Sequence, residues 1–133
     1  MDNCIFCKIA TGEFNAWKVY EDDFTLAFLD INPVTKYHTI VIPKQHFVNA
    51  LDIPEDVFLQ VMSTVKKVVN IYKEKLQLEN LQIIHNAGKI GQQDVFHLHA
   101  HVVPRYDGDG QDIKRKTSQV STAEFAEMIE FLR

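Results

Sequence analysis

Short runs rich in β-branched and aromatic residues, bounded by polar turns and prolines, predict the β-strands of this chain. We expect five of them, at residues 18–21, 25–29, 39–42, 81–84 and 97–103. Asp22 and Asp23 form the turn between the first two strands. Pro43 and Pro104 end the third and the fifth, because proline cannot continue a hydrogen-bonded ladder.

Two other segments place their apolar residues at helical spacing. In the first, Asp52 is the expected N-cap and Glu55 completes a capping box. The long amphipathic helix that follows runs to about Gln77. Its apolar positions are Val57, Phe58, Val61, Val65, Val68, Val69, Tyr72 and Leu76. A second capping box, Ser121 with Glu124, opens a C-terminal helix with apolar residues at Phe125, Met128, Ile129 and Leu132.

The order of strands, helix, strands and helix predicts an α+β fold with a mostly antiparallel five-stranded sheet. No repeat or linker divides the 133 residues, so we expect 1–133 to form a single domain. The apolar content of 46% and the charged content of 24% are those of an ordinary globular protein. No apolar run approaches the ~20 residues of a membrane-spanning helix, which argues against an integral membrane protein and a membrane partner.

The N-terminal segment lacks the basic region and the long apolar region of a secretory signal. We therefore expect a cytoplasmic protein, in which Cys4 and Cys7 are thiols or metal ligands. The net charge of −4 argues against long nucleic acid as a partner, because such proteins are usually basic. The basic cluster from Lys114 to Lys116 is expected to be a solvated loop. A single nucleotide is still a compatible ligand, since a small pocket can bind phosphate without a positive surface.

Three histidines occupy alternate positions of the last predicted strand. Because side chains alternate across a strand, His97, His99 and His101 project from one face and form a row ~13 Å long. Leu98, Ala100 and Val102 then project toward the core. Exposed polar strand faces usually mix several residue types, so a row of one type indicates chemistry.

Two kinds of chemistry suit such a row. Neutral imidazole is a common metal ligand, and two of the three side chains can hold one ion together. An imidazole nitrogen can also attack phosphorus and form a covalent phosphoramidate, which water then hydrolyses. Residues 86–94 contain two glycines and lead into this strand, and loops of that kind present backbone N–H groups to anions.

The segment 97–103 resembles the His-x-His-x-His-apolar-apolar signature of the histidine triad (HIT) nucleotide-binding proteins. Four further segments resemble the same family in the right order, at 4–9, 28–33, 38–46 and 86–95. The resemblance covers most of the chain and leaves only the C-terminal tail unplaced. It implies a HIT-like fold with one long helix and a C-terminal helix, a purine nucleotide as substrate, and a homodimer.

The resemblance also implies roles for individual residues. His99 would be the nucleophile on the α-phosphorus, and His101 would contact the phosphate and assist the leaving group; His97 belongs to the same catalytic row. Asp30 would accept hydrogen bonds from the ribose hydroxyls. The phosphate would be held by Asn86 and by the loop residues Gln93, Asp94 and Val95. The base would lie in an apolar slot formed by Ile5, Phe6, Ile9, Phe28 and Ile31, residues that equally suit a plain core.

Two positions depart from the family pattern. Gln92 stands where a second glycine is usual, and Asp94 where many members have Ser or Thr. A carboxylate beside a phosphate would repel it, so we expect backbone N–H groups, and not the Asp94 side chain, to face the anion.

Cys4 and Cys7 form a Cys-x-x-Cys pair, which alone fits a zinc half-site, a redox pair or chance. His46 and His97 would complete a Cys₂His₂ tetrahedron from distant parts of the chain. Zinc-binding members of the family are similar at these four positions, so the resemblance implies a structural Zn²⁺ site. His38 and His85 are expected to be hydrogen-bonded within the fold, with His38 supporting the active strand.

These features favour an enzyme that cleaves a phosphoramidate or phosphoanhydride bond at the α-phosphate of a nucleoside monophosphate derivative. A dinucleoside polyphosphate hydrolase, of the diadenosine tri- or tetraphosphate type, needs the same residues and is the alternative within enzymes. A nucleotide-sensing interaction protein with little turnover is the alternative outside them. The intact histidine row favours the enzyme.

Overall fold

One five-stranded antiparallel sheet forms the centre of the protein. The computed structural model describes residues 3–133. The strands β1 (Lys18–Glu21), β2 (Thr25–Leu29), β3 (Thr39–Pro43), β4 (Leu81–Ile84) and β5 (Ala100–Pro104) lie in the order β1-β2-β3-β5-β4. The helices are α1 (Ile5–Ala10), α2 (Glu55–Leu76) and α3 (Thr122–Leu132). The predicted α+β class and antiparallel sheet are confirmed.

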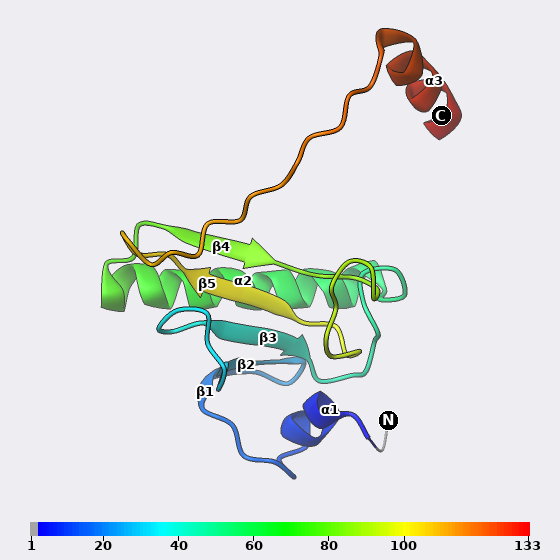
Figure 1. Cartoon of the computed structure of the whole chain (residues 1–133). Helices are drawn as coiled ribbons and strands as arrows, with labels where there is room; N and C mark the ends of the chain where they lie inside the picture. Colours follow the sequence, from blue (N-terminus) through cyan, green and yellow to red (C-terminus); the bar gives the residue numbers. More distant parts are fainter. Residues whose placement is uncertain (1–2) are drawn as a thin grey trace.

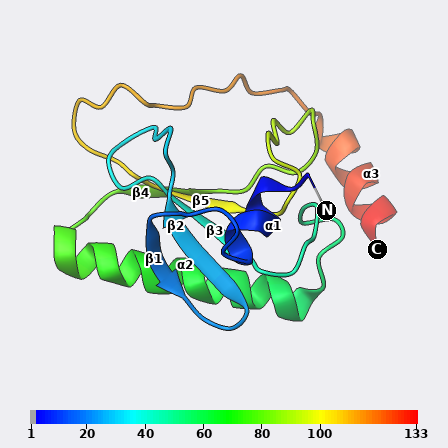
Figure 2. The same ribbon diagram turned by 90° about the horizontal axis from the view of Figure 1, so that it is seen from below.

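The long helix α2 covers one face of the sheet (Figures 1 and 2). Its valines at three- and four-residue spacing face the strands, because those positions share one side of a helix. The core on this face consists of Ala27, Val41, Val61, Val65, Val68, Tyr72, Leu98, Ala100 and Val102. The expected inward face of the histidine segment, with Leu98, Ala100 and Val102, is therefore confirmed.

The short helix α1 lies over the other face of the sheet, opposite α2 (Figure 2). Side chains alternate between the two faces of a strand, so every second residue of β2 and β3 points away from α2. Phe6 and Ile9 of α1 pack on these residues. This second core consists of Phe6, Ile9, Leu26, Phe28, Ile40 and Ile42. Because α1 covers only part of its face, a cavity lined by His99 and His101 stays open beside it.

The start of α2 corrects the predicted capping box. The N-cap is Pro54, without a side-chain hydrogen bond, and the helix begins at Glu55. The Asp52 carboxylate instead accepts hydrogen bonds from the backbone N–H groups of Val48 and Asn49, and so closes the preceding turn. Proline suits this position because its fixed φ and missing N–H cost nothing at a helix start. The predicted end was close, since Gln77 is the C-cap in a left-handed conformation.

The strand expected at 97–103 is shorter than predicted. Its ladder begins at Ala100, because the residues before it have other partners. The N–H of Leu98 donates to the carbonyl oxygen of Phe47, outside the sheet. His97 and His99 therefore lie on an extended segment that leads into β5 and keeps the alternation of faces.

The C-terminal helix α3 stands apart from the rest of the chain (Figure 1). Residues 111–121 form an exposed connection without regular structure, and no residue of α3 is buried. The predicted capping box is confirmed, with the Ser121 and Glu124 side chains each bonded to the other's backbone N–H. Within residues 3–133, no helix has the length and apolarity needed to cross a membrane.

We predict that Leu98→Ala destabilises the fold by about 2–5 kcal/mol, because Leu98 is fully buried and its loss leaves a cavity between the sheet and α2. Chemical denaturation followed by circular dichroism measures this change. Leu51→Ala is the control, since Leu51 is 88% exposed and should change the free energy of unfolding little. Equal effects of the two substitutions would contradict this account of the core.

Candidate active site and metal centre

A cavity of about 650 Å³ opens on the α1 side of the sheet, next to the histidines. All five residues of the expected apolar slot line it: Ile5, Phe6, Ile9, Phe28 and Ile31. Phe6, Ile9 and Phe28 also belong to the core under α1, so the slot and core interpretations are both correct for them. Asp30, Asp94, Val95, His99 and His101 line the same cavity.

Several lining residues were not predicted from the sequence. Phe14, Asn15, Ala16 and Trp17 form part of the wall, and Trp17 is 71% exposed. They lie between α1 and β1, outside every motif of the sequence. The exposure of Trp17 is a property of the folded chain, so no pattern in the sequence indicated its place in the wall.

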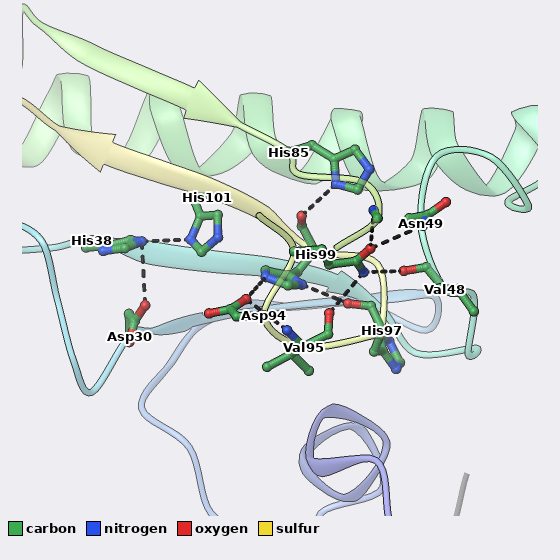
Figure 3. A network of polar contacts seen from close by, with 12 residues as sticks. Asp30, His38, Val48, Asn49, His85, Asp94, Val95, His97, His99 and His101 are labelled. Atoms are coloured by element: carbon green, nitrogen blue, oxygen red, sulfur yellow. Dashed lines mark hydrogen bonds and ion pairs between the residues drawn. The ribbon is translucent and has the colours of Figure 1, made fainter. Parts of the chain in front are cut away.

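The orientation of His99 follows from one hydrogen bond. Its Nδ1 lies 2.8 Å from the carbonyl oxygen of His97 (Figure 3). A carbonyl oxygen only accepts, so Nδ1 carries the proton in this contact and neutral His99 has a free lone pair on Nε2. The ring is buried against Phe6 at a centroid distance of 5.0 Å, which holds it in place. His99 therefore presents a nucleophilic nitrogen to the cavity.

His101 has the opposite tautomer. The Val34 N–H donates to His38 Nδ1 at 3.0 Å, so neutral His38 carries its proton on Nε2. That Nε2 donates to His101 Nδ1 at 2.8 Å, which leaves the proton of neutral His101 on its own Nε2. Burial, and after it the neighbouring His99, lower the pKa of His101 to about 4, so His101 is neutral at pH 7. It offers a neutral N–H donor beside the nucleophile.

The remaining histidines outside the row are hydrogen-bonded, as expected. His38 also lies 3.6 Å from an Asp30 carboxylate oxygen, which links it to the predicted ribose contact. His85 donates from Nδ1 to the carbonyl oxygen of His99 (Figure 3). Its Nε2 accepts from the Ala50 N–H. Both side chains hold the active segment in place.

Gln93 is built into the fold of the phosphate loop. Its side-chain oxygen accepts from Asn49 Nδ2 and the Gly88 N–H, and its side-chain nitrogen donates to the carbonyl oxygens of Val48 and Val95. The side chain is buried and all four of its bonding positions are used. This geometry does not support the predicted contact of Gln93 with a nucleotide; Gln93 shapes the loop instead. Asn86 does not line the cavity, and its contact with phosphate stays a prediction.

The backbone at Gly91 and Gln92 suits glycine at both positions of the loop. A Cβ on Gly91 would lie 2.3 Å from the carbonyl oxygen of Ala87, so only glycine fits. Gln92 has a φ of 71°, in the left-handed region that favours glycine. The chain accepts this strain at the position where it departs from the family pattern.

Asp94 corrects an expectation. We expected its carboxylate to turn away from the anion site, but Oδ1 lies 3.4 Å from His99 Nε2 and accepts the Val95 N–H at 2.9 Å (Figure 3). Partial burial raises the pKa of this carboxyl, but the N–H groups of Val95 and Asp94 lower it more, so the net pKa is below the usual value. A charged carboxylate therefore faces the nucleophile.

Cys4, Cys7, His46 and His97 converge on one point beside α1, as predicted. Their ligand atoms all lie within 4.8 Å of one another. His97 Nδ1 is 3.3 Å from the Cys4 sulfur, 3.5 Å from the Cys7 sulfur and 3.1 Å from His46 Nδ1. Tetrahedral zinc, with bonds of ~2.3 Å to sulfur and ~2.0–2.1 Å to nitrogen, spaces its ligands at about these distances. The four side chains thus fit a closed tetrahedral metal site.

The hydrogen bonds and the burial around this cluster support the same interpretation. His97 Nε2 donates to the carbonyl oxygen of Pro43 at 2.8 Å, so the lone pair of neutral His97 lies on Nδ1, toward the sulfurs. Burial lowers the pKa of His97 to about 4 and keeps it in the neutral, ligating form. Burial and the neighbouring Cys4 raise the pKa of Cys7 to about 11, a shift that a bound cation would reverse.

This arrangement corrects the catalytic assignment of His97. Its side chain is fully buried, faces the cysteines and does not line the cavity. It acts on the site only through its backbone carbonyl, which orients His99. Within the described residues, no disulfide joins Cys4 and Cys7.

Comparison with known proteins agrees with the fold and the site. The model of the HIT domain family matches residues 11–108. An uncharacterized HIT-like protein of Methanocaldococcus jannaschii is 47% identical over 111 residues, which cover 84% of this chain and 85% of that protein. The adenosine 5′-monophosphoramidase of Candida albicans is 36% identical over 109 residues, or 79% of this chain and 72% of that protein.

Solved structures are similar over nearly the whole chain. A crystal structure of a protein from Streptococcus mutans has a TM-score of 0.93 and 36% identity, and covers 99% of this chain and 84% of that one. A zinc-bound histidine triad family protein from Mycobacterium smegmatis has a TM-score of 0.79 and 34% identity, and covers 98% of both chains.

Proposed function

This chain belongs to the HIT domain family of nucleotide-binding hydrolases, and we propose that it cleaves the bond between the α-phosphorus and the leaving group of a purine nucleotide derivative. The reaction would be two-step, through a nucleotidyl intermediate on His99. The observation that carries this proposal is the hydrogen-bond pattern of the two rings. It leaves the lone pair of neutral His99 on Nε2 and the proton of neutral His101 on Nε2. Transfer of a nucleotidyl group from its leaving group to a histidine nitrogen requires a nucleophile and a hydrogen-bond donor.

The first step forms a bond between His99 Nε2 and the α-phosphorus and breaks the bond to the leaving group. The leaving atom departs with the electron pair, and the Nε2–H of His101 stabilises its developing charge. Water then attacks phosphorus and displaces His99. Over both steps, water supplies a hydroxyl to phosphorus and a proton to the leaving group, and His99 returns to its first state.

The remaining lining residues would hold the nucleotide. The apolar side chains from α1 and β2 suit a flat base, and a purine buries more area there than a pyrimidine. Asp30 directly follows β2 and lines the cavity, and its carboxylate would accept hydrogen bonds from ribose hydroxyls. The name of the Candida albicans relative, a 5′-monophosphoramidase, supports an AMP derivative as substrate. A cytoplasmic location also stays a prediction.

We predict that His99→Asn abolishes turnover of AMP-morpholidate but keeps the fold, because asparagine fits an extended segment and no other group in the cavity replaces the nucleophile. AMP binding, measured by calorimetry, should survive, since base and ribose contacts come from other residues. His101→Asn should be milder, with a loss of ~10²–10³ in rate for one transition-state donor.

Different results would contradict the proposed mechanism and the proposed hydrolase function. Near-normal turnover by His99→Asn would remove the proposed mechanism. Wild-type protein that binds AMP but turns over neither AMP-amidates nor diadenosine polyphosphates would instead favour a nucleotide-sensing protein. Circular dichroism of each variant checks that its fold is intact.

We also propose that the Cys₂His₂ cluster holds one structural Zn²⁺. The fit of the four ligand atoms and the zinc-bound Mycobacterium smegmatis structure support this assignment. Bound there, zinc would tie α1 to the segments around His46 and His97, with no open position for catalysis.

Purified protein should therefore contain about one zinc per chain, and its removal by a chelator should lower the melting temperature. Cys7→Ser should lose the metal, whereas His38→Asn, a histidine outside the cluster, should retain it. Elemental analysis and thiol titration measure both. Zinc-free protein with two freely reacting thiols in the folded state would overturn the assignment.

We further propose that two copies pair through α3. An isolated helix of 11 residues is marginal in water, and this one exposes an apolar stripe of Phe125, Met128, Ile129 and Leu132. The Streptococcus mutans structure covers 99% of this chain at a TM-score of 0.93, so the agreement extends to α3 held away from its own domain. A second copy supplies the missing apolar partner for such a helix.

Sedimentation at micromolar concentration should give twice the chain mass for wild type and the single mass for the double variant Phe125→Asp with Ile129→Asp. Both substitutions charge the apolar stripe. Glu127→Ala, on the polar side of α3, is the matched control and should remain a dimer. A monomeric wild type, or a double variant that still pairs, would contradict the role of α3.

A further inference from the structure

The Asp94 carboxylate occupies the place where the phosphoryl group meets the nucleophile. One of its oxygens is 3.4 Å from His99 Nε2 and 2.9 Å from the backbone nitrogen of Val95. Its side chain is 77% exposed, so solvent and ligand reach it. A nucleotide on His99 must therefore bind beside this negative charge or displace it from the Val95 N–H.

Apart from the histidines themselves, the part of the cavity that the structure describes has no positively charged group that could offset that charge. Among the described residues that line the cavity, the ionisable ones are Asp30, Asp94, His99 and His101. None is a lysine or an arginine. The charged side chains of the cavity are thus carboxylates, and polar phosphate contacts come from neutral N–H groups.

The two candidate substrate classes differ most in the charge of their leaving group. A nucleoside phosphoramidate carries its negative charge on the α-phosphate, and its leaving amine is neutral or cationic. A dinucleoside polyphosphate carries further negative charges on the phosphates that leave. At 0.1 M ionic strength, charges interact effectively over ~10 Å, a range that would include the leaving phosphates of a dinucleoside polyphosphate and the Asp94 carboxylate. Inside a partly closed cavity, salt screens this repulsion less. A ligand that brings negative charge next to a carboxylate binds less well than a ligand without that charge.

We propose that Asp94 is a specificity-determining residue, whose carboxylate disfavours nucleotide derivatives with a polyanionic leaving group relative to those with an amine leaving group. This inference rests on the proposed hydrolase function. It assigns a role to the residue that departs from the Ser or Thr of the family pattern. Repulsion of the unwanted class, and not a new attraction, produces the selectivity.

The test measures kcat/KM for diadenosine tetraphosphate and for AMP-morpholidate in wild type and in Asp94→Asn. Asparagine keeps the size of the side chain and its bond to the Val95 N–H but removes the charge. The ratio of the two kcat/KM values, tetraphosphate over morpholidate, should rise about tenfold in the variant. Added salt should raise the same ratio in wild type and change it less in Asp94→Asn. Asp107→Asn removes an exposed carboxylate outside the cavity and should leave the ratio unchanged.

An unchanged ratio in Asp94→Asn, with both substrates still turned over, would overturn the inference and leave the proposed hydrolase intact. An equal rise in Asp107→Asn would show that net charge, not Asp94, sets the preference, and would overturn it as well. Absence of turnover for both substrates in wild type would instead refute the proposed function itself. Asp94→Ser distinguishes charge from size, since it should raise the ratio as Asp94→Asn does.

Discussion

The hydrogen bond from His99 Nδ1 to the carbonyl oxygen of His97 connects the metal centre, the sheet and the reacting nitrogen. The same residue whose ring faces the cysteines provides the backbone acceptor that fixes the next ring. His97 is in turn held by the carbonyl oxygen of Pro43, at the end of β3. A shift of this segment would therefore move both the His99 ring and the Cys₂His₂ cluster, so the proposed metal site and the proposed nucleophile depend on the same backbone.

The sequence predicted the layout of the fold well, because the signals were local. Period-two alternation in the histidine segment, valines at helical spacing and the Ser121 capping box each predicted what the structure contains. The capping box at Asp52 was wrong because Pro54 takes the N-cap, which frees Asp52 to close the preceding turn. The strand at 97–103 was too long because Leu98 bonds outside the sheet, a tertiary contact that no local pattern contains.

The structure brings together most of the residues that the sequence singled out, and their roles stay predictions. His99, His101 and the apolar slot lie together, and the four metal-ligand candidates converge. His97 and Gln93 turn away from the cavity, since their hydrogen bonds are made within the protein. The approach of Asp94 to His99 depends on the conformation of the loop, which includes the strained Gln92. Trp17 joins the wall from a segment without any motif, and only the folded chain brings it there.

The proposed mechanism depends most on the tautomers of His99 and His101. Nitrogen-15 NMR of the imidazole rings measures these tautomers directly at neutral pH. His99 should be protonated on Nδ1 with a bare Nε2, and His101 should be protonated on Nε2 with a bare Nδ1. Assignment through His99→Asn and His101→Asn identifies each ring. The reversed pattern, with His99 protonated on Nε2 and no lone pair facing the cavity, would contradict His99 as the nucleophile.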